Sequence, residues 1–242
     1  MLIKDHQILT KRCRELAELG YVAIDTEFIR ENTYRAQLCL IQLCGPAYKP
    51  IAIDVLIDDV DLSPVFDLLD NPNLIKVFHS CRQDIEILYG ITGKVPEPIF
   101  DTQVAAMVCG FGDSVGFGTL VSKITGIRVD KSPQSSDWAL RPLTDRQINY
   151  ALEDVRHLCT IYERLRDQLN NTGRMGWLSE EMAFLEDSAT YKVDPREAWR
   201  RVSHKHAGRR TLAVLRELAA WREETASNQN VPRSYIMRDD SL

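Results

Sequence analysis

Two carboxylates separated by a single residue lie in an apolar segment, and their spacing favours metal-ion chemistry. Asp25 and Glu27 belong to the run Tyr21–Phe28, which otherwise has the pattern of a buried strand. In a strand, residues i and i+2 face the same side, so the two carboxylates would lie side by side. Such close charges repel unless they are protonated, paired with a base or bridged by a cation such as Mg²⁺ or Mn²⁺. The pair therefore predicts a divalent cation site or, more simply, a strand end whose acids face solvent.

A second acidic position belongs to a predicted helix. The segment Thr144–Asp167 has a helical pattern, with Thr144 as the N-cap and Gln147 completing a capping box. Within it, Tyr150 and Asp154 are four residues apart and share a face of the helix. Their neighbours on that stripe are apolar, so we expect Asp154 at the buried edge of the helix.

A third acidic position, Asp84, follows a short apolar segment. Residues Leu74–Phe78 are expected to form a buried strand, and Ser80 is expected to be the N-cap of the next helix. Asp84 would then lie in the first turns of that helix. The helix dipole alone favours a carboxylate there, so Asp84 by itself does not require a metal.

These acids and the tyrosine occur together in one known family. An Asp-x-Glu strand, a later helical Asp and a Tyr-x-x-x-Asp helix resemble the motifs of ribonuclease D, of the 3′-5′ exonuclease superfamily. Further segments resemble this family in the same order, and the similarity covers essentially the whole chain. They are Gln37–Leu43, Phe100–Gln103, Ser136–Trp138 and Arg141–Thr144.

Alternating strand and helix patterns predict an α/β domain with a mixed central sheet flanked by helices. We expect strands at Val22–Thr26, Gln37–Leu43, Ile51–Val55, Leu74–Phe78 and Ile99–Thr102. We expect helices at Ile8–Leu19, Pro64–Leu69, Cys81–Tyr89 and Gln103–Val108. The resemblance implies that this sheet is ribonuclease-H-like. Beyond residues 133–142 the chain is expected to be all-helical.

The predicted organisation has three parts: an exonuclease domain at 1–170, a helical connector at 171–206 and a final part at 207–242. The final part resembles the opening of an HRDC domain, a small helical module that binds nucleic acid and follows the nuclease in ribonuclease D. Residues 207–242 are too few to bury an apolar face of their own. We therefore expect a truncated HRDC domain whose tail docks on the nuclease or is poorly ordered.

The resemblance implies a metal-dependent 3′-5′ exoribonuclease that shortens RNA, chiefly precursor tRNA, and releases nucleoside 5′-monophosphates. Two cations, Mg²⁺ or Mn²⁺, about 4 Å apart would be held by four acids. These are Asp25, Glu27, Asp84 and Asp154. We expect Asp25 to bridge both cations, Glu27 and Asp154 to hold one, and Asp84 to complete the outer shell of the other. With a reference pKa near 10, Tyr150 would orient the attacking water and not deprotonate it.

Contacts with substrate are expected from five further residues, each of which also has an ordinary structural interpretation. They are Phe28, Gln37, His79, Lys131 and Arg141. Phe28 would stack on the terminal base or pack in the core, and His79 would contact the terminal phosphate or ribose. The other three would contact the RNA backbone, although Arg141 is equally compatible with a surface charge. Asp101, at the end of a strand, is expected to support the acids without binding a cation.

Composition is compatible with a nucleic-acid partner despite the negative net charge. The chain of 242 residues carries a formal charge of −5, which at first argues against such a partner. The four acids contribute −4, so two divalent cations would leave −5 + 4 = −1. Residues 192–222 hold nine basic and three acidic side chains, so this segment has a net formal charge of +6. Such a segment could bind a phosphate backbone, or it could be the solvent-exposed face of a helix.

The sequence offers no sign of a membrane segment or a zinc site. No apolar run reaches the roughly 18 residues of a membrane span, and residues 1–6 lack a signal-peptide pattern. We expect a cytoplasmic monomer without an organic cofactor. The six cysteines contain no C-x-x-C pair, so we expect reduced core residues.

Three alternatives stay open. A DNA-directed 3′-5′ exonuclease would use the same chemistry, because discrimination rests on 2′-hydroxyl contacts that the sequence does not expose. An inactive nucleic-acid-binding module would have lost its acids, whereas all four acids and Tyr150 are present. A non-enzymatic scaffold with acids facing solvent would show no thermal shift with Mg²⁺ or Mn²⁺.

Overall fold

The described residues of the computed structural model, 1–57, 60–130, 132–204 and 208–242, divide into two units. We call Met1–Ile29 together with Leu38–Thr190 the sheet unit. We call Arg30–Gln37 together with Tyr191–Leu242 the helical unit. All the acidic positions predicted to bind metal belong to the sheet unit.

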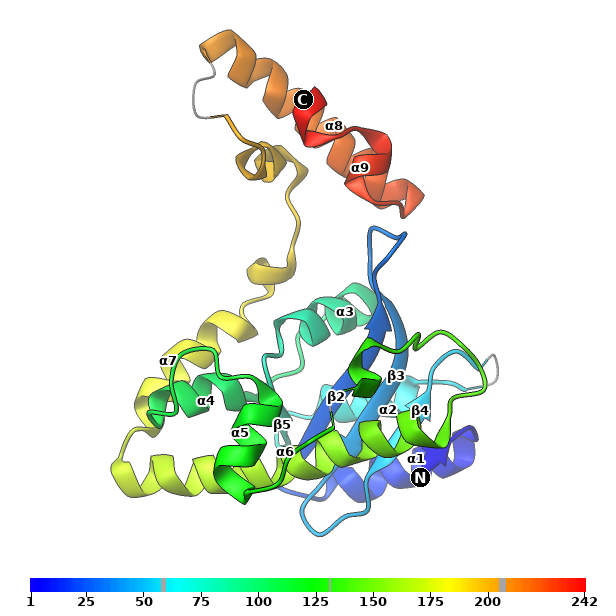
Figure 1. Cartoon of the computed structure of the whole chain (residues 1–242), viewed down its shortest axis with the longest axis vertical. Coiled ribbons are helices and arrows are strands. Elements are labelled where there is room, and N and C mark those ends of the chain that lie inside the picture. Colours follow the sequence, from blue (N-terminus) through cyan, green and yellow to red (C-terminus); the bar gives the residue numbers. More distant parts are fainter. Residues whose placement is uncertain (58–59, 131, 205–207) are drawn as a thin grey trace. The chain divides into compact units, whose positions relative to one another are not determined.

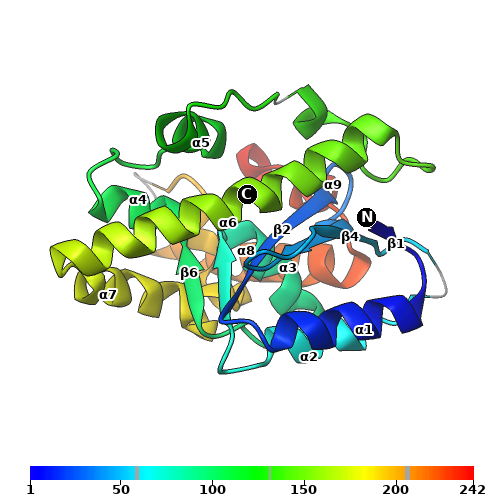
Figure 2. The ribbon, with the colours of Figure 1, turned by 90° about the horizontal axis from the view of Figure 1, so that it is seen from below.

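A six-stranded mixed sheet forms the centre of the sheet unit (Figures 1 and 2). Its strand order is β1-β4-β3-β2-β5-β6. The strands are β1 (Leu2–Ile3), β2 (Tyr21–Ile29), β3 (Gln37–Cys44), β4 (Ile51–Asp54), β5 (Ile75–Phe78) and β6 (Ile99–Asp101). Strand β1 is parallel to β4, β5 is parallel to both β2 and β6, and β3 is antiparallel to β4. The predicted α/β fold is therefore confirmed. Strand β1 was not predicted, because two residues carry no recognisable periodicity.

Helices cover both faces of this sheet. They are α1 (His6–Ala17), α2 (Ser63–Leu69), α3 (Arg82–Thr92), α4 (Thr102–Val108), α5 (Phe117–Thr125), α6 (Asp145–Thr172) and α7 (Met175–Glu186). Helix α6 lies across one face and packs on β2, β4 and β5, whereas α1 and α2 pack together on the other side (Figure 2). Helix α5 was not predicted. The glycines at 116 and 118 weaken the helical pattern at its start.

Helix α6 begins at the predicted capping box. The Thr144 hydroxyl accepts from the Gln147 backbone N–H (3.2 Å), and Gln147 Oε1 accepts from the Thr144 backbone N–H (3.0 Å). The helix ends at Gly173, whose φ of +67° is the left-handed conformation typical of a C-terminal cap. It continues past the predicted end at residue 167, because the buried stripe extends from Leu165 to Leu169.

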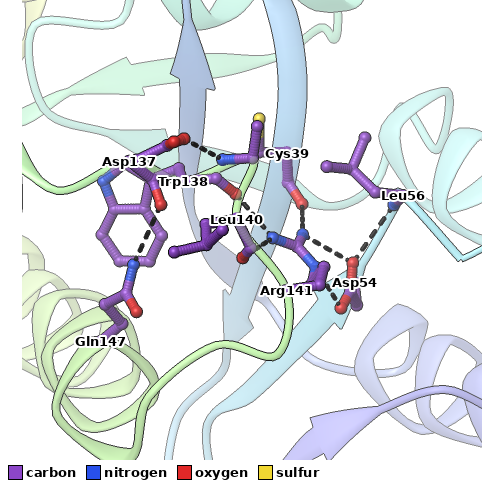
Figure 3. A network of polar contacts seen from close by, with 9 residues as sticks. Cys39, Asp54, Leu56, Asp137, Trp138, Leu140, Arg141 and Gln147 are labelled. Carbon is purple, nitrogen blue, oxygen red and sulfur yellow. Dashed lines mark hydrogen bonds and ion pairs between the residues drawn. The ribbon is translucent and has the colours of Figure 1, made fainter.

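A buried ion pair joins the segment before α6 to β4 (Figure 3). Arg141 Nε and Nη2 donate to the two carboxylate oxygens of Asp54 at 2.8 and 2.7 Å, and the Asp54 side chain is 2% exposed. The same guanidinium donates to the carbonyl oxygens of Trp138 (2.6 Å) and Cys39 (2.9 Å). These contacts give Arg141 a structural role, and its contact with substrate stays a prediction.

The helical unit contains one long helix and several short turns. Its elements are η3 (Pro195–Arg201), α8 (Arg209–Gln229), α9 (Arg233–Ile236) and η4 (Asp239–Ser241), and η2 (Ser188–Tyr191) spans its boundary. The Asp194 side chain caps η3 by accepting from the Arg196 backbone N–H at 2.8 Å. Helix α8 packs against η3 and α9 and buries Leu215 and Ala219.

The six cysteines are free and five of them are buried, in agreement with the prediction of reduced core residues. Across the described ranges, no helix has both the length and the apolar character needed to cross a membrane.

Candidate active site

A cleft of about 510 Å³ in the sheet unit collects the residues that were predicted to do chemistry. Its lining includes Asp25, Glu27, Asp84, Tyr150 and Asp154. The first two belong to β2, Asp84 belongs to α3, and the last two belong to α6. Three elements that are distant in sequence thus place four carboxyl groups and one phenol on a common cavity.

The carboxylates are close enough to share a cation. Asp25, Glu27 and Asp154 each offer an oxygen, and these three oxygens lie within 4.8 Å of one another. Asp84 accepts a hydrogen bond from the hydroxyl of Thr26, which lies between the two β2 acids. Asp154 Oδ1 is buried and has no hydrogen-bond partner among the described residues. An orphaned acceptor beside two other carboxylates fits the all-oxygen coordination that Mg²⁺ and Mn²⁺ prefer.

Burial raises the pKa of every acid in this group, and the charges of neighbouring carboxylates add to the shift. Desolvation, with the charges of Asp154 and Asp84, raises the pKa of Glu27 to about 9. Desolvation raises the pKa of Asp84 and of Asp154 to about 7, although each accepts a hydrogen bond that opposes the shift. The pKa of Asp25 is also well above its ordinary value, because the group is desolvated and faces the other three carboxyls. Without a cation, the group therefore retains protons at neutral pH.

Tyr150 lies beside the acids on the same cleft. Its hydroxyl and the carboxylate of Asp154, one helical turn away, shift each other's pKa. Its ring lies 6.2 Å from the ring of Trp138, a residue that is 2% exposed. Desolvation and the Asp154 charge raise the pKa of Tyr150 above its ordinary value of 10, so the phenol stays protonated at neutral pH. This state supports the predicted orienting role and argues against Tyr150 as a general base.

Asp101 organises the turn that leads into α3. Its carboxylate accepts from the backbone N–H groups of Ser80 (3.0 Å), Cys81 (2.8 Å) and Gln103 (2.7 Å). The prediction of Ser80 as the N-cap of α3 is wrong: Cys81 holds that position, and Ser80 has a φ of +58°. The bonds from Ser80 and Cys81 stabilise this turn, and the bond from Gln103 stabilises the start of α4 (Thr102–Val108). They support the expectation that Asp101 assists the acids without binding a cation.

Of the five residues predicted to contact substrate, two line the cleft. Phe28 and His79 line the cleft, and His79 Nδ1 lies 3.0 Å from the hydroxyl of Thr102. Gln37 is exposed in the helical unit, so its contact with substrate stays a prediction. Lys131 lies outside the described residues. Arg141 is engaged by the buried ion pair described above.

Other residues line the cleft without having been predicted as site residues. They include Gln83, Gln103, Phe117 and Gln134. Gln83 directly precedes Asp84, and Gln103 belongs to the same motif segment as Asp101, so their closeness in sequence to these acids could have indicated them. Phe117 meets the His79 ring edge to face, with the ring centres 5.3 Å apart. Only tertiary folding brings Phe117 and Gln134 to this cavity, because neither is near a motif acid in sequence.

A family model described as 3′-5′ exonuclease matches residues 1–170, the part of the chain that holds the cleft. The chain belongs to this 3′-5′ exonuclease family. A second model, the HRDC domain, matches residues 211–242. The exonuclease match includes all five residues that the motifs predicted, and the HRDC match agrees with the predicted module at the end of the chain.

Relatives of this chain share its sequence or its fold over long stretches. Ribonuclease D of Granulibacter bethesdensis is 51% identical over 241 residues, which is 100% of this chain and 61% of that protein. The crystal structure of Escherichia coli RNase D has a TM-score of 0.91 and 33% identity, covering 99% of this chain and 64% of that one. Brucella melitensis NrnC with bound Mg²⁺ has a TM-score of 0.65 and 25% identity, covering 80% of this chain and 94% of that one.

These comparisons confirm the predicted resemblance to ribonuclease D and the predicted fold. The chain spans 61% of the length of the Granulibacter relative.

Proposed function

We propose that this chain is a metal-dependent 3′-5′ exoribonuclease that shortens the 3′ ends of precursor tRNA and other RNA. Each step would release a nucleoside 5′-monophosphate. The observation that carries this proposal is the set of three carboxylate oxygens within 4.8 Å, with Asp154 Oδ1 lacking a partner among the described residues. The Escherichia coli RNase D structure is described as that of an exoribonuclease involved in structured RNA processing, which supports RNA as the substrate.

The cations proposed for this site are two Mg²⁺ or two Mn²⁺ ions held by the four acids. Such ions lower the pKa of an attacking water and stabilise negative charge on the phosphoryl and leaving oxygens. Asp25 lies among three other carboxyl groups, so it is the proposed bridging ligand. Glu27 and Asp154 would hold one ion and Asp84 would complete the outer shell of the other. Mg²⁺ bound to the related NrnC supports divalent ions of this kind.

The remaining cleft residues would position the RNA end. Phe28 is partly exposed on the cleft and presents a ring on which a terminal base stacks. His79, fixed by Thr102 and Phe117, would contact the terminal phosphate or ribose. Tyr150 would donate its proton in a hydrogen bond that orients the attacking water. Water enters from solvent, and the departing oxygen remains on the shortened RNA as its new 3′-hydroxyl.

Replacing Tyr150 by Phe should lower turnover about 10-fold to 100-fold, the range found when a residue that orients a metal-site group is removed. The Michaelis constant should change less, because the ring and its packing on Trp138 are kept. Steady-state cleavage of a labelled RNA oligomer measures both quantities. Unchanged turnover would exclude an orienting role for the hydroxyl.

Cleavage of a precursor tRNA with a 3′ trailer tests the proposed function. The expected result is stepwise shortening from the 3′ end with Mg²⁺ or Mn²⁺, none with chelator, and slower loss from a DNA strand of the same sequence. Faster loss from DNA would establish the alternative, an exodeoxyribonuclease with the same chemistry. No cleavage of either strand by folded protein would contradict the proposed activity and favour a binding module.

We also propose a division of the chain into three parts, which the two family matches support. The parts are an exonuclease domain at 1–170, a connector at 171–206 and an HRDC part at 207–242. The monomeric state and cytoplasmic location expected from the sequence stay predictions.

A further inference from the structure

The acidic cleft, the cavity that the four acids line with Tyr150, also contains uncharged side chains that the proposed reaction does not use. One of them is Gln103, the second residue of α4, which lines the same cavity and is half-buried. A side-chain amide offers two N–H donors and one acceptor oxygen without adding charge. The contacts of Gln103 decide which of these groups a substrate can meet.

The sheet register places Gln103 two strands away from the acids of β2. Ala23 of β2, Val77 of β5 and Phe100 of β6 form one row across three adjacent parallel strands. Asp25 lies two residues beyond this row on β2, and α4 begins two residues beyond it on the side of β6. Adjacent strands are about 4.8 Å apart, so the start of α4 is about 10 Å from Asp25. A single nucleotide bound at the acids can therefore reach Gln103.

Both the main chain and the side chain of Gln103 are anchored. Its backbone N–H donates to the Asp101 carboxylate at 2.7 Å, within the N-terminal cap of α4. Its Nε2 donates to the carbonyl oxygen of Val115 at 3.2 Å, in the segment before α5. A side chain that is already held in place loses little conformational freedom when it binds a ligand, which favours a discriminating contact.

The bond to Val115 determines the orientation of the amide. A carbonyl oxygen accepts hydrogen bonds and cannot donate them, so Gln103 must turn its NH₂ group and not its oxygen toward Val115. Among the described residues no donor bonds to Gln103 Oε1, and this oxygen is not buried. Gln103 thus offers the cleft an uncharged acceptor in a fixed orientation.

The chemistry of this acceptor selects a hydroxyl group of the sugar. Phosphate oxygens are acceptors themselves and cannot bond to Gln103 Oε1. The 2′-hydroxyl is a donor that RNA has and DNA lacks. Every ribonucleotide carries it, whereas the donors on base edges differ from base to base. An enzyme that removes successive nucleotides of different sequence can therefore use this contact at each step.

An amide suits this contact better than a carboxylate would. A fifth carboxylate in the cleft would repel the phosphodiester and would compete with the four acids for the cations. Gln83 and Gln134 line the same cleft, but within the described ranges no hydrogen bond holds either side chain. Gln103 is therefore the cleft glutamine whose acceptor is held in one orientation.

We propose that Gln103 Oε1 accepts a hydrogen bond from the 2′-hydroxyl of the 3′-terminal nucleotide and so favours RNA over DNA. This inference rests on the proposed ribonuclease function and adds a specificity-determining residue to it.

Removal of the terminal nucleotide from two matched RNA oligomers tests this proposal. The oligomers have one sequence and differ only in the 3′-terminal sugar, which is ribose in one and 2′-deoxyribose in the other. In the parent protein, kcat/KM should be about tenfold higher for the ribose end, because the deoxyribose end leaves the acceptor of Gln103 unpaired. Gln103→Met keeps the length of the side chain and removes the amide, so this ratio should fall below about twofold through a slower reaction of the ribose end.

The ratio separates a contact with substrate from a structural role. If Gln103 only holds the segment at Val115, Gln103→Met lowers both rates by the same factor and the preference persists, which would overturn the proposal. Gln83→Met is the matched control in the same cleft and should keep the preference of the parent. A preference that is lost in Gln83→Met and kept in Gln103→Met would assign the 2′-hydroxyl to Gln83 and would also overturn the proposal.

The parent protein alone distinguishes this proposal from the proposed function. Equal removal of both ends with Mg²⁺ or Mn²⁺ would leave the exonuclease activity established and overturn the role of Gln103. No removal of either end would contradict the proposed function itself, and the role of Gln103 would fail with it.

Discussion

Replacing Asp25 by Asn should reduce removal of nucleotides from an RNA 3′ end by roughly 10³-fold or more. Asn keeps the size of the side chain but loses the charge that a bridging ligand needs. Asp25 faces Asp84, Glu27 and Asp154, so its loss disrupts the whole set of carboxylates and not a single contact. Initial rates on a labelled RNA oligomer with saturating Mn²⁺ measure the effect.

The same substitution should stabilise the protein when no divalent cation is present. An uncharged amide removes one of four mutually repelling groups, so we expect the Tm to rise by about 3 °C or more at pH 8. Glu153→Gln is the matched control, because Glu153 is adjacent to Asp154 but pairs with Arg156 and does not line the cleft. The control should keep most of the activity. An Asp25→Asn protein that retains more than a tenth of the parent rate would contradict the proposed role.

The stability of the cation-free protein should fall as the pH rises from 6 to 8. Glu27 has a folded-state pKa of about 9, and Asp84 and Asp154 have values of about 7, all far above the ordinary values of 4.5 and 3.8. Over this window the folded protein holds protons that the unfolded chain has released. The free energy of unfolding therefore decreases with increasing pH.

Thermal unfolding without and with 5 mM Mn²⁺ checks this prediction. We expect the Tm of the cation-free protein to drop by roughly 5 °C between pH 6 and 8, and Mn²⁺ to reverse the trend because it competes with protons for the same oxygens. The window stops at pH 8, because burial lowers the pKa of Lys76 to about 8 and that group acts in the opposite direction above it. Glu27→Gln should flatten the cation-free curve. A Tm that rises with pH equally in parent and variant would contradict the raised pKa values.

The acids were predictable because their placement follows from local geometry. The spacing of Asp25 and Glu27 on a strand, and of Tyr150 and Asp154 on a helix, fixes which side chains share a face before any tertiary contact is known. Asp84 was predictable only through the resemblance, because a helix N-terminus alone explains a carboxylate. The structure adds a reason for its position, the two backbone bonds that Asp101 accepts from Ser80 and Cys81 at the start of α3.

Other features depend on contacts between distant segments and left no local pattern. The ion pair of Arg141 was not predictable, because its partner Asp54 lies 87 residues away in sequence and is buried by the fold. Phe117 reaches the cleft from α5, a helix that the glycine-containing pattern concealed. The sequence alone showed that residues 192–222 carry a net positive charge. Only the structure shows that Arg196 and Arg200 are neutralised by acids whereas Arg201 lines a cavity with Arg222.

The number and position of bound cations can be measured directly by anomalous scattering from crystals of the chain soaked in Mn²⁺. The proposed mechanism predicts two peaks about 4 Å apart in the acidic cleft, in contact with oxygens of the four acids, and loss of at least one peak in Asp25→Asn crystals. No peak in the cleft at saturating Mn²⁺, or peaks bound only by groups outside it, would contradict a metal-dependent nuclease site at these residues.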